Sequence, residues 1–187
     1  MPDDRNSAAT KFIALLRGVN VGGKVLKMNE LVEVLALKKY KNIKTYIQSG
    51  NIIFDLHNIK TEQLSKNIED LINVAFGISV SVIIRTEKDF KAVIKNNPLI
   101  KITDNDINKL HVTFLKEEPL PSTLLALENL MYENERYEIN GKEIYLYCPN
   151  GYGRTKLNNV NIERKLKTIA TTRNWKTTLK LYELSQT

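Results

Sequence analysis

The chain has 187 residues, of which 42% are hydrophobic, and a formal net charge of +7. The hydrophobic fraction suffices for a packed core and argues against global disorder, and the length suits one large domain or two small ones. No apolar run approaches the roughly 20 residues of a membrane helix, and the polar opening MPDDRNSAAT is unlike a signal peptide. One cysteine, Cys148, excludes an internal disulfide and a multi-cysteine zinc site, so we expect a cytoplasmic protein.

The first half of the sequence predicts elements in the order β-α-β-β-α-β. The apolar run at 12–17 indicates a buried strand, and apolar residues at helical spacing indicate a helix near 28–39. Two strands around a Ser49-Gly50 turn follow, then an amphipathic helix over 64–75 and the β-branched strand SVSVIIRT. This order is that of a ferredoxin-like unit.

The same order recurs in the second half. A helix near 87–97, with a capping box from Thr86 to Asp89, leads to a linker at 98–108. The strand KLHVTFL comes next, followed by a helix with Leu120, Leu124, Leu127 and Met131 and by a hairpin that turns at Asn140-Gly141. A helix with Ile162, Leu166 and Ile169 then leads to the strand IATT. A final helix has Trp175, Leu179 and Tyr182 on one face.

We therefore predict an α+β protein with two ferredoxin-like subdomains in tandem and mainly antiparallel sheets. Residues 11–97 form the first half with its connecting helix, 98–108 the linker, and 109–187 the second half with a C-terminal helix. The halves share landmarks that suggest duplication: Tyr46 and Tyr137 each stand four residues before a hairpin glycine, and Arg85 and Arg173 each stand between a strand and a helix.

The stretch RGVNVGGK, residues 17–24, nearly matches the phosphate-binding loop G-x-x-x-x-G-K-[ST]. Val25 stands where that pattern requires a hydroxyl for magnesium, and helical periodicity begins only near Met28. A P-loop also requires a parallel sheet, whereas the hairpins indicate antiparallel pairing. We therefore disfavour nucleotide hydrolysis. We interpret RGVNVGGK as a glycine loop whose backbone N–H groups suit a phosphate or carboxylate.

In a β-α-β-β-α-β unit, the loop after the first strand and the hairpin between the second and third strands lie at one end. In the first half these are RGVNVGGK and QSGN. We therefore predict one ligand-binding end that contains Arg17, Gly18, Asn20, Gly22, Gly23, Lys24, Gln48, Ser49 and Asn51.

In the second half, positive charge follows the third and fourth strands. Residues 151–187 hold eight basic and two acidic side chains, whereas residues 1–150 hold 20 and 19. This asymmetry predicts an anionic partner, although a solvated helix face would give the same counts. Arginine can bind an oxyanion bidentately and tyrosine can stack on a base, so the predicted binding residues are Tyr152, Arg154, Thr155, Lys156, Arg173 and Asn174.

Other chemistry has little support. Two histidines, His57 and His111, without an HExxH pattern argue against a metal site and favour surface or strand-edge positions. No cofactor is indicated. Ser49 lacks the G-x-S-x-G elbow and suits a turn, and Cys148 on an apolar strand suits a buried hydrophobe.

RNA recognition through the sheet face is disfavoured. RNA-recognition motifs place stacking aromatic residues on their first and third strands, and these strands offer only Phe12 and Phe54 here. Contact through the basic C-terminal surface stays open, and such binding should depend strongly on salt.

Distinctive blocks run from about Ala14 to Leu181. They are ALLRGVNVGGK, KMNEL, TYIQSGN, VIIRT, HVTFL, IYLYCPNGYGRTKL and TTRNWKTTLKL. In these blocks the sequence resembles the domain of unknown function 1697 family; Thr155 stands where many members carry serine. The resemblance implies an α+β fold with two ferredoxin-like subdomains, and it implies no activity and no catalytic residues.

We expect a protein that binds a phosphate-containing small molecule or a nucleic acid, away from any membrane. Two alternatives stay open: an enzyme that uses the same positive groups to stabilise charge on an anionic substrate, and a scaffold or homo-oligomer whose motifs only stabilise the fold. The sequence leaves the ligand, the reaction and the oligomeric state undecided, as well as whether the two groups of loops form one cleft.

Overall fold

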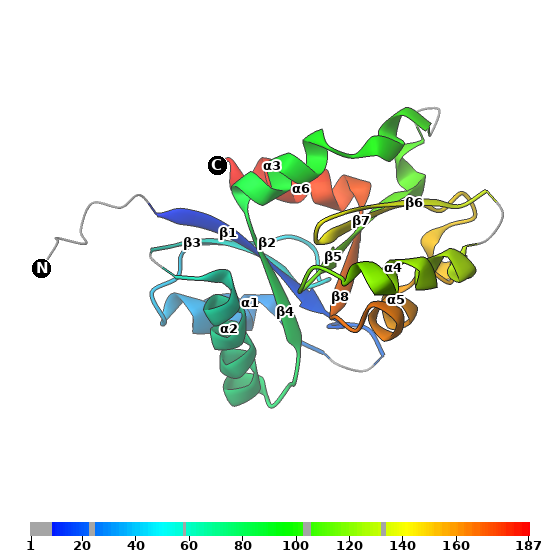
Figure 1. Cartoon of the computed structure of the whole chain (residues 1–187). Helices are drawn as coiled ribbons and strands as arrows, with labels where there is room; N and C mark the ends of the chain where they lie inside the picture. The colour runs from blue at the N-terminus through cyan, green and yellow to red at the C-terminus, as the bar shows by residue number, and fades with distance from the viewer. Residues whose placement is uncertain (1–8, 23–24, 58, 103–105, 132–133) are drawn as a thin grey trace, which may run out of the picture. The chain divides into compact units, whose positions relative to one another are not determined.

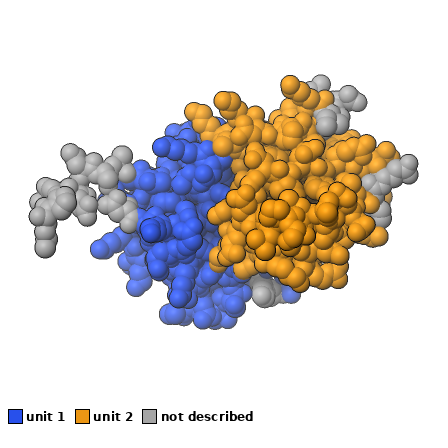
Figure 2. All heavy atoms as spheres, in the orientation of Figure 1, with its two compact units in different colours: residues 1–90, 181–187 blue, residues 91–180 orange. Residues whose placement is uncertain are grey.

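The computed structural model describes residues 9–22, 25–57, 59–102, 106–131 and 134–187 (Figure 1). The chain divides into two compact units (Figure 2). Unit 1 consists of residues 1–90 and 181–187, and unit 2 of residues 91–180. The two divisions fall within helix α3, Glu87–Lys95, and helix α6, Trp175–Ser185.

Unit 1 has the predicted β-α-β-β-α-β order. Its elements are β1 (Thr10–Arg17), α1 (Met28–Ala36), β2 (Lys41–Thr45), β3 (Asn51–Leu56), α2 (Thr61–Phe76) and β4 (Ser81–Thr86). The strands form one sheet in the order β2-β3-β1-β4, and every neighbouring pair is antiparallel.

Unit 2 repeats this topology. Its elements are β5 (Leu110–Leu115), α4 (Pro121–Leu124), η4 (Leu125–Leu130), β6 (Arg136–Asn140), β7 (Glu143–Tyr147), η5 (Tyr152–Arg154), α5 (Asn159–Leu166) and β8 (Ala170–Asn174). The sheet order is β6-β7-β5-β8, again antiparallel throughout. The prediction of two tandem ferredoxin-like subdomains is therefore confirmed.

The segment predicted as a linker, 98–108, contains two 3-10 helices, η2 (Pro98–Ile102) and η3 (Ile107–Lys109). The capping box at the start of α3 is present. The Thr86 backbone N–H donates to Asp89 Oδ2 at 2.7 Å, and the Asp89 N–H donates to Thr86 Oγ1 at 3.2 Å. These bonds satisfy two backbone donors that the first helical turn leaves without partners.

Each unit buries one face of its sheet under its helices. In unit 1, Phe12, Ala14 and Leu16 of β1 share a core cluster with helix residues such as Leu31 and Ile68. The alternate β1 residues are buried as well, which explains the unbroken apolar run in this central strand. In unit 2 the equivalent cluster contains Leu115, Ile144, Leu146, Leu127 and Ile162.

Two local predictions for unit 2 differ from the structure. The segment predicted as one helix around 120–131 is helical only over α4 and continues as the 3-10 helix η4, which buries Leu127 and Leu130 and leaves Met131 exposed. Three-residue spacing suits the three residues per turn of a 3-10 helix. The second hairpin turns at Gly141-Lys142, because Asn140 pairs with Glu143 and Gly141 takes a φ of 58°.

Two polar contacts occur at equivalent places in both units. Arg85 Nη1 donates to the Ile84 carbonyl at 3.0 Å, and Arg173 Nη1 donates to the Thr172 carbonyl at 2.9 Å. On the second helix of each unit, a glutamate Oε1 accepts from a backbone N–H of the fourth strand. The pairs are Val82 N–H to Glu69 at 2.8 Å and Ala170 N–H to Glu163 at 3.0 Å.

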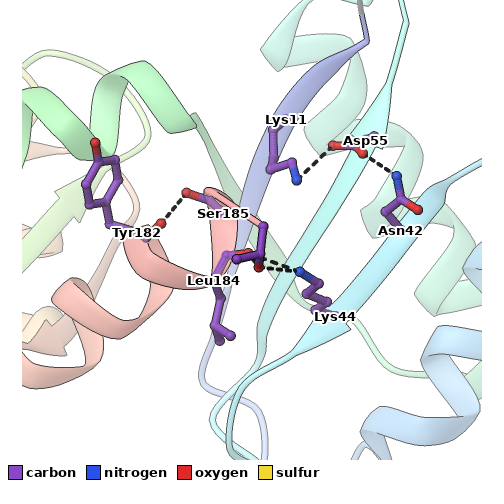
Figure 3. A network of polar contacts seen from close by, with 8 residues as sticks. Lys11, Asn42, Lys44, Asp55, Tyr182, Leu184 and Ser185 are labelled. Carbon is purple, nitrogen blue, oxygen red and sulfur yellow. Dashed lines mark hydrogen bonds and ion pairs between the residues drawn. The ribbon is translucent and has the colours of Figure 1, made fainter.

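The segment 181–187 is tied to the sheet of unit 1 (Figure 3). Lys44 Nζ of β2 donates to the Leu184 carbonyl at 3.4 Å and to Thr187 Oγ1 at 2.6 Å. Nearby, Lys11 Nζ lies 3.7 Å from Asp55 Oδ1, and Asn42 Nδ2 donates to Asp55 Oδ2 at 2.6 Å. The end of α6 is therefore an integral part of unit 1.

Candidate anion-binding site

The glycine loop of unit 1 is closed by the side chain of Asn20. Its Oδ1 accepts from the Leu26 N–H at 2.8 Å, and its Nδ2 donates to the Leu26 carbonyl at 3.0 Å and to the Gln48 carbonyl at 2.5 Å. Asn20 itself takes a left-handed φ of 56°, which asparagine tolerates better than most residues. The predicted proximity of the glycine loop and the QSGN hairpin is thereby confirmed.

The QSGN hairpin packs tightly against the end of β1. Gly50 has a φ of 72°, and a Cβ atom at this position would lie 2.5 Å from Val19 Cγ2 and 2.7 Å from Leu16 Cβ. Its carbonyl accepts from the Leu16 N–H at 2.8 Å. Only glycine fits both the backbone conformation and the space.

Asn51 is fully buried and supports the same hairpin. Its Nδ2 donates to the Tyr46 carbonyl at 3.0 Å and to Ser49 Oγ at 2.9 Å. Asn20 and Asn51 thus use their side-chain amides, the groups that could otherwise bind a ligand, to hold the loops in place. Arg17 and Gly18 are half-buried, and Gly22 and Gln48 are exposed at this end of the unit. The predicted residues Gly23 and Lys24 lie outside the described residues.

The loop of unit 2 that carries Arg154 and Lys156 is also built from internal contacts. Gly151 takes a φ of 88°, and η5 follows it directly. Thr155 Oγ1 accepts from the Leu157 N–H at 3.0 Å, and Asn158 caps α5 by accepting from the Asn161 N–H at 3.1 Å. Each contact removes freedom that the loop would otherwise lose on binding.

Tyr152 anchors this loop to the sheet through the hydroxyl of Thr172. That hydroxyl donates to Asn159 Oδ1 at 2.7 Å and accepts from the Tyr152 hydroxyl at 2.9 Å. It also lies 2.7 Å from the Thr113 hydroxyl. Because a hydroxyl has a single proton, Thr172 must accept from Thr113, and its hydrogen-bonding capacity is then full.

His111 lies against the other side of this arrangement. Its ring stacks on the Tyr152 ring, with centroids 5.0 Å apart and an interplanar angle of 25°. Burial lowers the pKa of His111, so the imidazole is neutral at pH 7. The expected surface or strand-edge position was wrong for His111, which is buried on the central strand β5, whereas His57 is exposed.

Three exposed cations lie in this loop or in the helix that follows it: Arg154, Lys156 and Arg164. Asn161 joins the loop backbone to one of them, because its Nδ2 donates to the Lys156 backbone carbonyl at 2.8 Å and its Oδ1 accepts from Arg164 Nη2 at 3.0 Å. Arg164 was absent from the predicted site. Its position in the last turn of the helix that follows a charged loop was the signal available in the sequence.

Arg173 does not follow the fourth strand, as the sequence had suggested, but lies within β8. The side chain is 7% exposed, and Nη1 also donates to Thr171 Oγ1 at 2.8 Å. Burial lowers the pKa of the guanidinium to about 10, partly offset by the nearby Tyr152, so the group stays charged at pH 7. Asn174 is exposed and caps α6 by accepting from the Thr177 N–H at 2.7 Å.

Cys148 is fully buried, which confirms its interpretation as a small hydrophobe. Burial, reinforced by the Glu135 carboxylate, raises the pKa of the thiol to about 12, far above that of a reactive cysteine. In the described ranges, no three His, Cys, Asp or Glu side chains are grouped to hold a metal ion. No helix in the described part of the chain is long and apolar enough to span a membrane.

The fold and its loops define an α+β protein with two ferredoxin-like units, each with one elaborated loop. The chain belongs to the family described as Protein of unknown function (DUF1697), whose sequence profile matches residues 9–145. A conserved bacterial protein from Streptococcus pneumoniae has a similar solved structure, with a TM-score of 0.76 and 26% sequence identity. The similarity covers 95% of this chain and 99% of that one. No curated protein matches the sequence.

Proposed function

We propose that the protein binds a phosphorylated or other anionic ligand, a nucleotide or a nucleic acid, at the basic loop and helix of unit 2. The observation that carries this proposal is the charge of residues 151–180, where eight basic side chains accompany one acidic side chain. Arg154, Lys156 and Arg164 are exposed around a loop that internal hydrogen bonds already fix.

The chemistry of these groups suits phosphate. A guanidinium can donate two parallel hydrogen bonds to one phosphate, and an ammonium adds a compact charge. Asn161 joins the Lys156 backbone to the Arg164 guanidinium, which keeps the two residues close enough for neighbouring phosphates of one ligand to engage both cations. A loop that is ordered before binding loses little conformational entropy, so more of the electrostatic attraction appears as affinity.

The glycine loop of unit 1 is the second proposed element. Arg17, Gln48 and the backbone N–H groups next to Gly18 and Gly22 would contact the anion. Asn20 and Asn51 would act by holding the loop and the hairpin, because their side chains bond to carbonyls of the chain. In unit 2, Tyr152 and Thr155 would have the corresponding supporting role.

The test measures fluorescence anisotropy of a labelled single-stranded RNA, a labelled DNA duplex and a labelled ATP analogue across a range of salt concentrations. We expect wild-type protein to bind at least one of the three probes. The Arg154→Ala/Lys156→Ala/Arg164→Ala variant should lose about 100-fold in affinity for that probe. On a nucleic acid, its salt dependence should also weaken by about 0.7–0.9 per phosphate contact removed.

The matched control is Lys60→Ala/Lys66→Ala/Lys88→Ala, which removes the same charge from exposed positions of unit 1. It should change the affinity by less than about threefold. Arg17→Gln tests the glycine loop and should cause an intermediate loss. The proposal is wrong if wild-type protein binds none of the probes, or if both triple variants lose affinity equally.

A further inference from the structure

A groove of about 470 Å³ lies between α1 and α2 on unit 1, remote in sequence from the basic surface described above. Val34, Leu71 and Val74 give it apolar walls. Lys38 lines it from just beyond the end of α1, and Asp70 lines it from α2. Its volume lies within the range of sites that take a ligand or a partner side chain, roughly 300–1,000 Å³.

Two strongly exposed apolar side chains lie in or next in sequence to the lining of the groove. Val74 is 87% exposed and Leu37, next to Lys38, is 84% exposed, the two highest values among the large apolar side chains in the described residues. A single exposed leucine or valine is ordinary on a protein surface. One such residue in the groove lining and a second next in sequence to another lining residue are more typical of an interaction site.

The charges at the groove have both signs. In the described part of the chain, neither the Lys38 side chain nor the Asp70 side chain forms an ion pair. A surface that carries an exposed valine, an apolar groove, one cation and one anion can pair with a second copy of itself. A two-fold axis at the groove can bring the cation of one copy to the anion of the other and Val74 of each copy to the opposite groove.

We propose that this groove is the contact surface of a symmetric homodimer. Val74 of each copy enters the groove of the other copy. Lys38 of each copy pairs with Asp70 of the other, which gives two equivalent ion pairs. A small ligand in the groove would leave Val74 and Leu37 at the rim in water, whereas a second copy buries both. The dimer does not depend on the anion-binding function, because it uses a different surface on unit 1.

The test is the mass of the full chain in solution, measured by sedimentation velocity from about 1 µM to about 100 µM protein. We expect wild-type protein to be a dimer in the upper part of this range. Val74→Asp should weaken dimerisation at least about tenfold, because it places a charge in the partner's apolar groove. Val160→Asp is the control, since Val160 is 65% exposed on α5 of unit 2, and it should leave the mass unchanged.

Charge reversal distinguishes this contact from any other dimer. Lys38→Asp and Asp70→Lys should each weaken dimerisation about tenfold, because each places like charges opposite one another. The variant with both changes restores opposite charges and should regain most of the wild-type affinity. All four side chains are at the surface, so unchanged circular dichroism should show that each variant folds.

A wild-type protein that stays monomeric up to about 100 µM would overturn the proposal, whatever small molecule the groove holds. A dimer that tolerates Val74→Asp, or a double charge reversal that fails to restore the dimer, would overturn it as well. Anion binding measured on the Val74, Lys38 and Asp70 variants should be unchanged, so failure of either proposal is visible independently of the other.

Discussion

The two units have the same sheet but elaborate different loops. In unit 1 the long connection runs between β1 and α1, and it contains Gly18, Gly22 and Asn20, whose side chain bonds across the loop. In unit 2 the long connection lies between β7 and α5. The features common to both, the buried arginine of the fourth strand and the glutamate of the second helix, lie in the regular elements. The shared residues therefore stabilise the fold, and the loops distinguish the units.

One pair of facing residues on the first and fourth strands of each sheet shows this divergence directly. Ala14 pairs with Ile84 in unit 1 and belongs to its apolar core. The corresponding pair in unit 2 is Thr113 and Thr172, whose hydroxyls hold Tyr152. Unit 2 therefore has hydrogen bonds at a position where unit 1 has only hydrocarbon, and those bonds fix the loop next to the cations.

The largest difference is expected between the loop glycines of the two units. Gly50→Ala should cost about 3 kcal/mol or more in the free energy of unfolding, because its Cβ would overlap Val19 and Leu16 and its φ is positive. Gly151→Ala should cost only about 1–2 kcal/mol, since no atom lies within 4 Å of the added Cβ and only backbone strain remains. Urea unfolding of both variants measures the two costs, and equal values would contradict this reading of the hairpin.

The Thr113–Thr172 hydroxyl pair of unit 2 corresponds to an apolar pair in unit 1, and substitutions at the two places should have different effects. Thr172→Val should cost about 2 kcal/mol, because it leaves Tyr152, Thr113 and Asn159 without the hydroxyl they share. Ile84→Val at the equivalent position of unit 1 should cost about 1 kcal/mol from one lost methylene. Amide hydrogen exchange should speed up at residues 151–155 only in Thr172→Val. Unaltered exchange there would show that the network does not hold the loop.

The two helix glutamates should behave alike. Glu69→Ala and Glu163→Ala each remove a charged acceptor from a backbone N–H of the fourth strand, at 2.8 and 3.0 Å. Each should lower the free energy of unfolding by about 1.5 kcal/mol. Thermal and urea unfolding check the values. A cost confined to one unit would mean that the contact matters in that unit alone.

The smallest effect concerns pH. Because burial lowers the pKa of His111 below 6.5, the unfolded chain binds more protons than the folded one as the pH falls below 6.5. Stability should therefore decrease as the pH falls through the interval between 6.5 and the lower folded pKa, and level off below it. His111→Gln should remove this part of the pH dependence, and His57→Gln, at an exposed position of unit 1, should not.

Strand order and loop placement could be predicted from the sequence because apolar periodicity fixes which residues face a core and hairpin turns fix the direction of each strand. The glycine loop and QSGN were correctly placed at one end for this reason. The roles of Asn20 and Asn51 could not be predicted, because the sequence does not show which remote carbonyl a side-chain amide reaches. Their contribution to an anion site stays a prediction, as do the domain boundaries.

The burial of Arg173 was missed for a related reason. A charged residue in a basic segment suggests a surface position, and only the register of β8 against β5 turns its side chain toward the interior. The threonine network was equally hidden, because Thr113 and Thr172 look like ordinary strand residues and stand 59 positions apart. A polar residue on the apolar face of a central strand is the signal that could have found it.

The bonds from Lys44 to the segment 181–187 have a consequence for how the protein is made. Residues 91–180 are synthesised between the two parts of unit 1. The ribosome therefore releases the sheet of unit 1 early, and it releases residues 181–187, which bond to that sheet, only after all of unit 2. Unit 2 is continuous and can complete its contacts first. Unit 1 lacks the contacts of residues 181–187 until synthesis ends, so its sheet is open to chaperones and proteases during that interval.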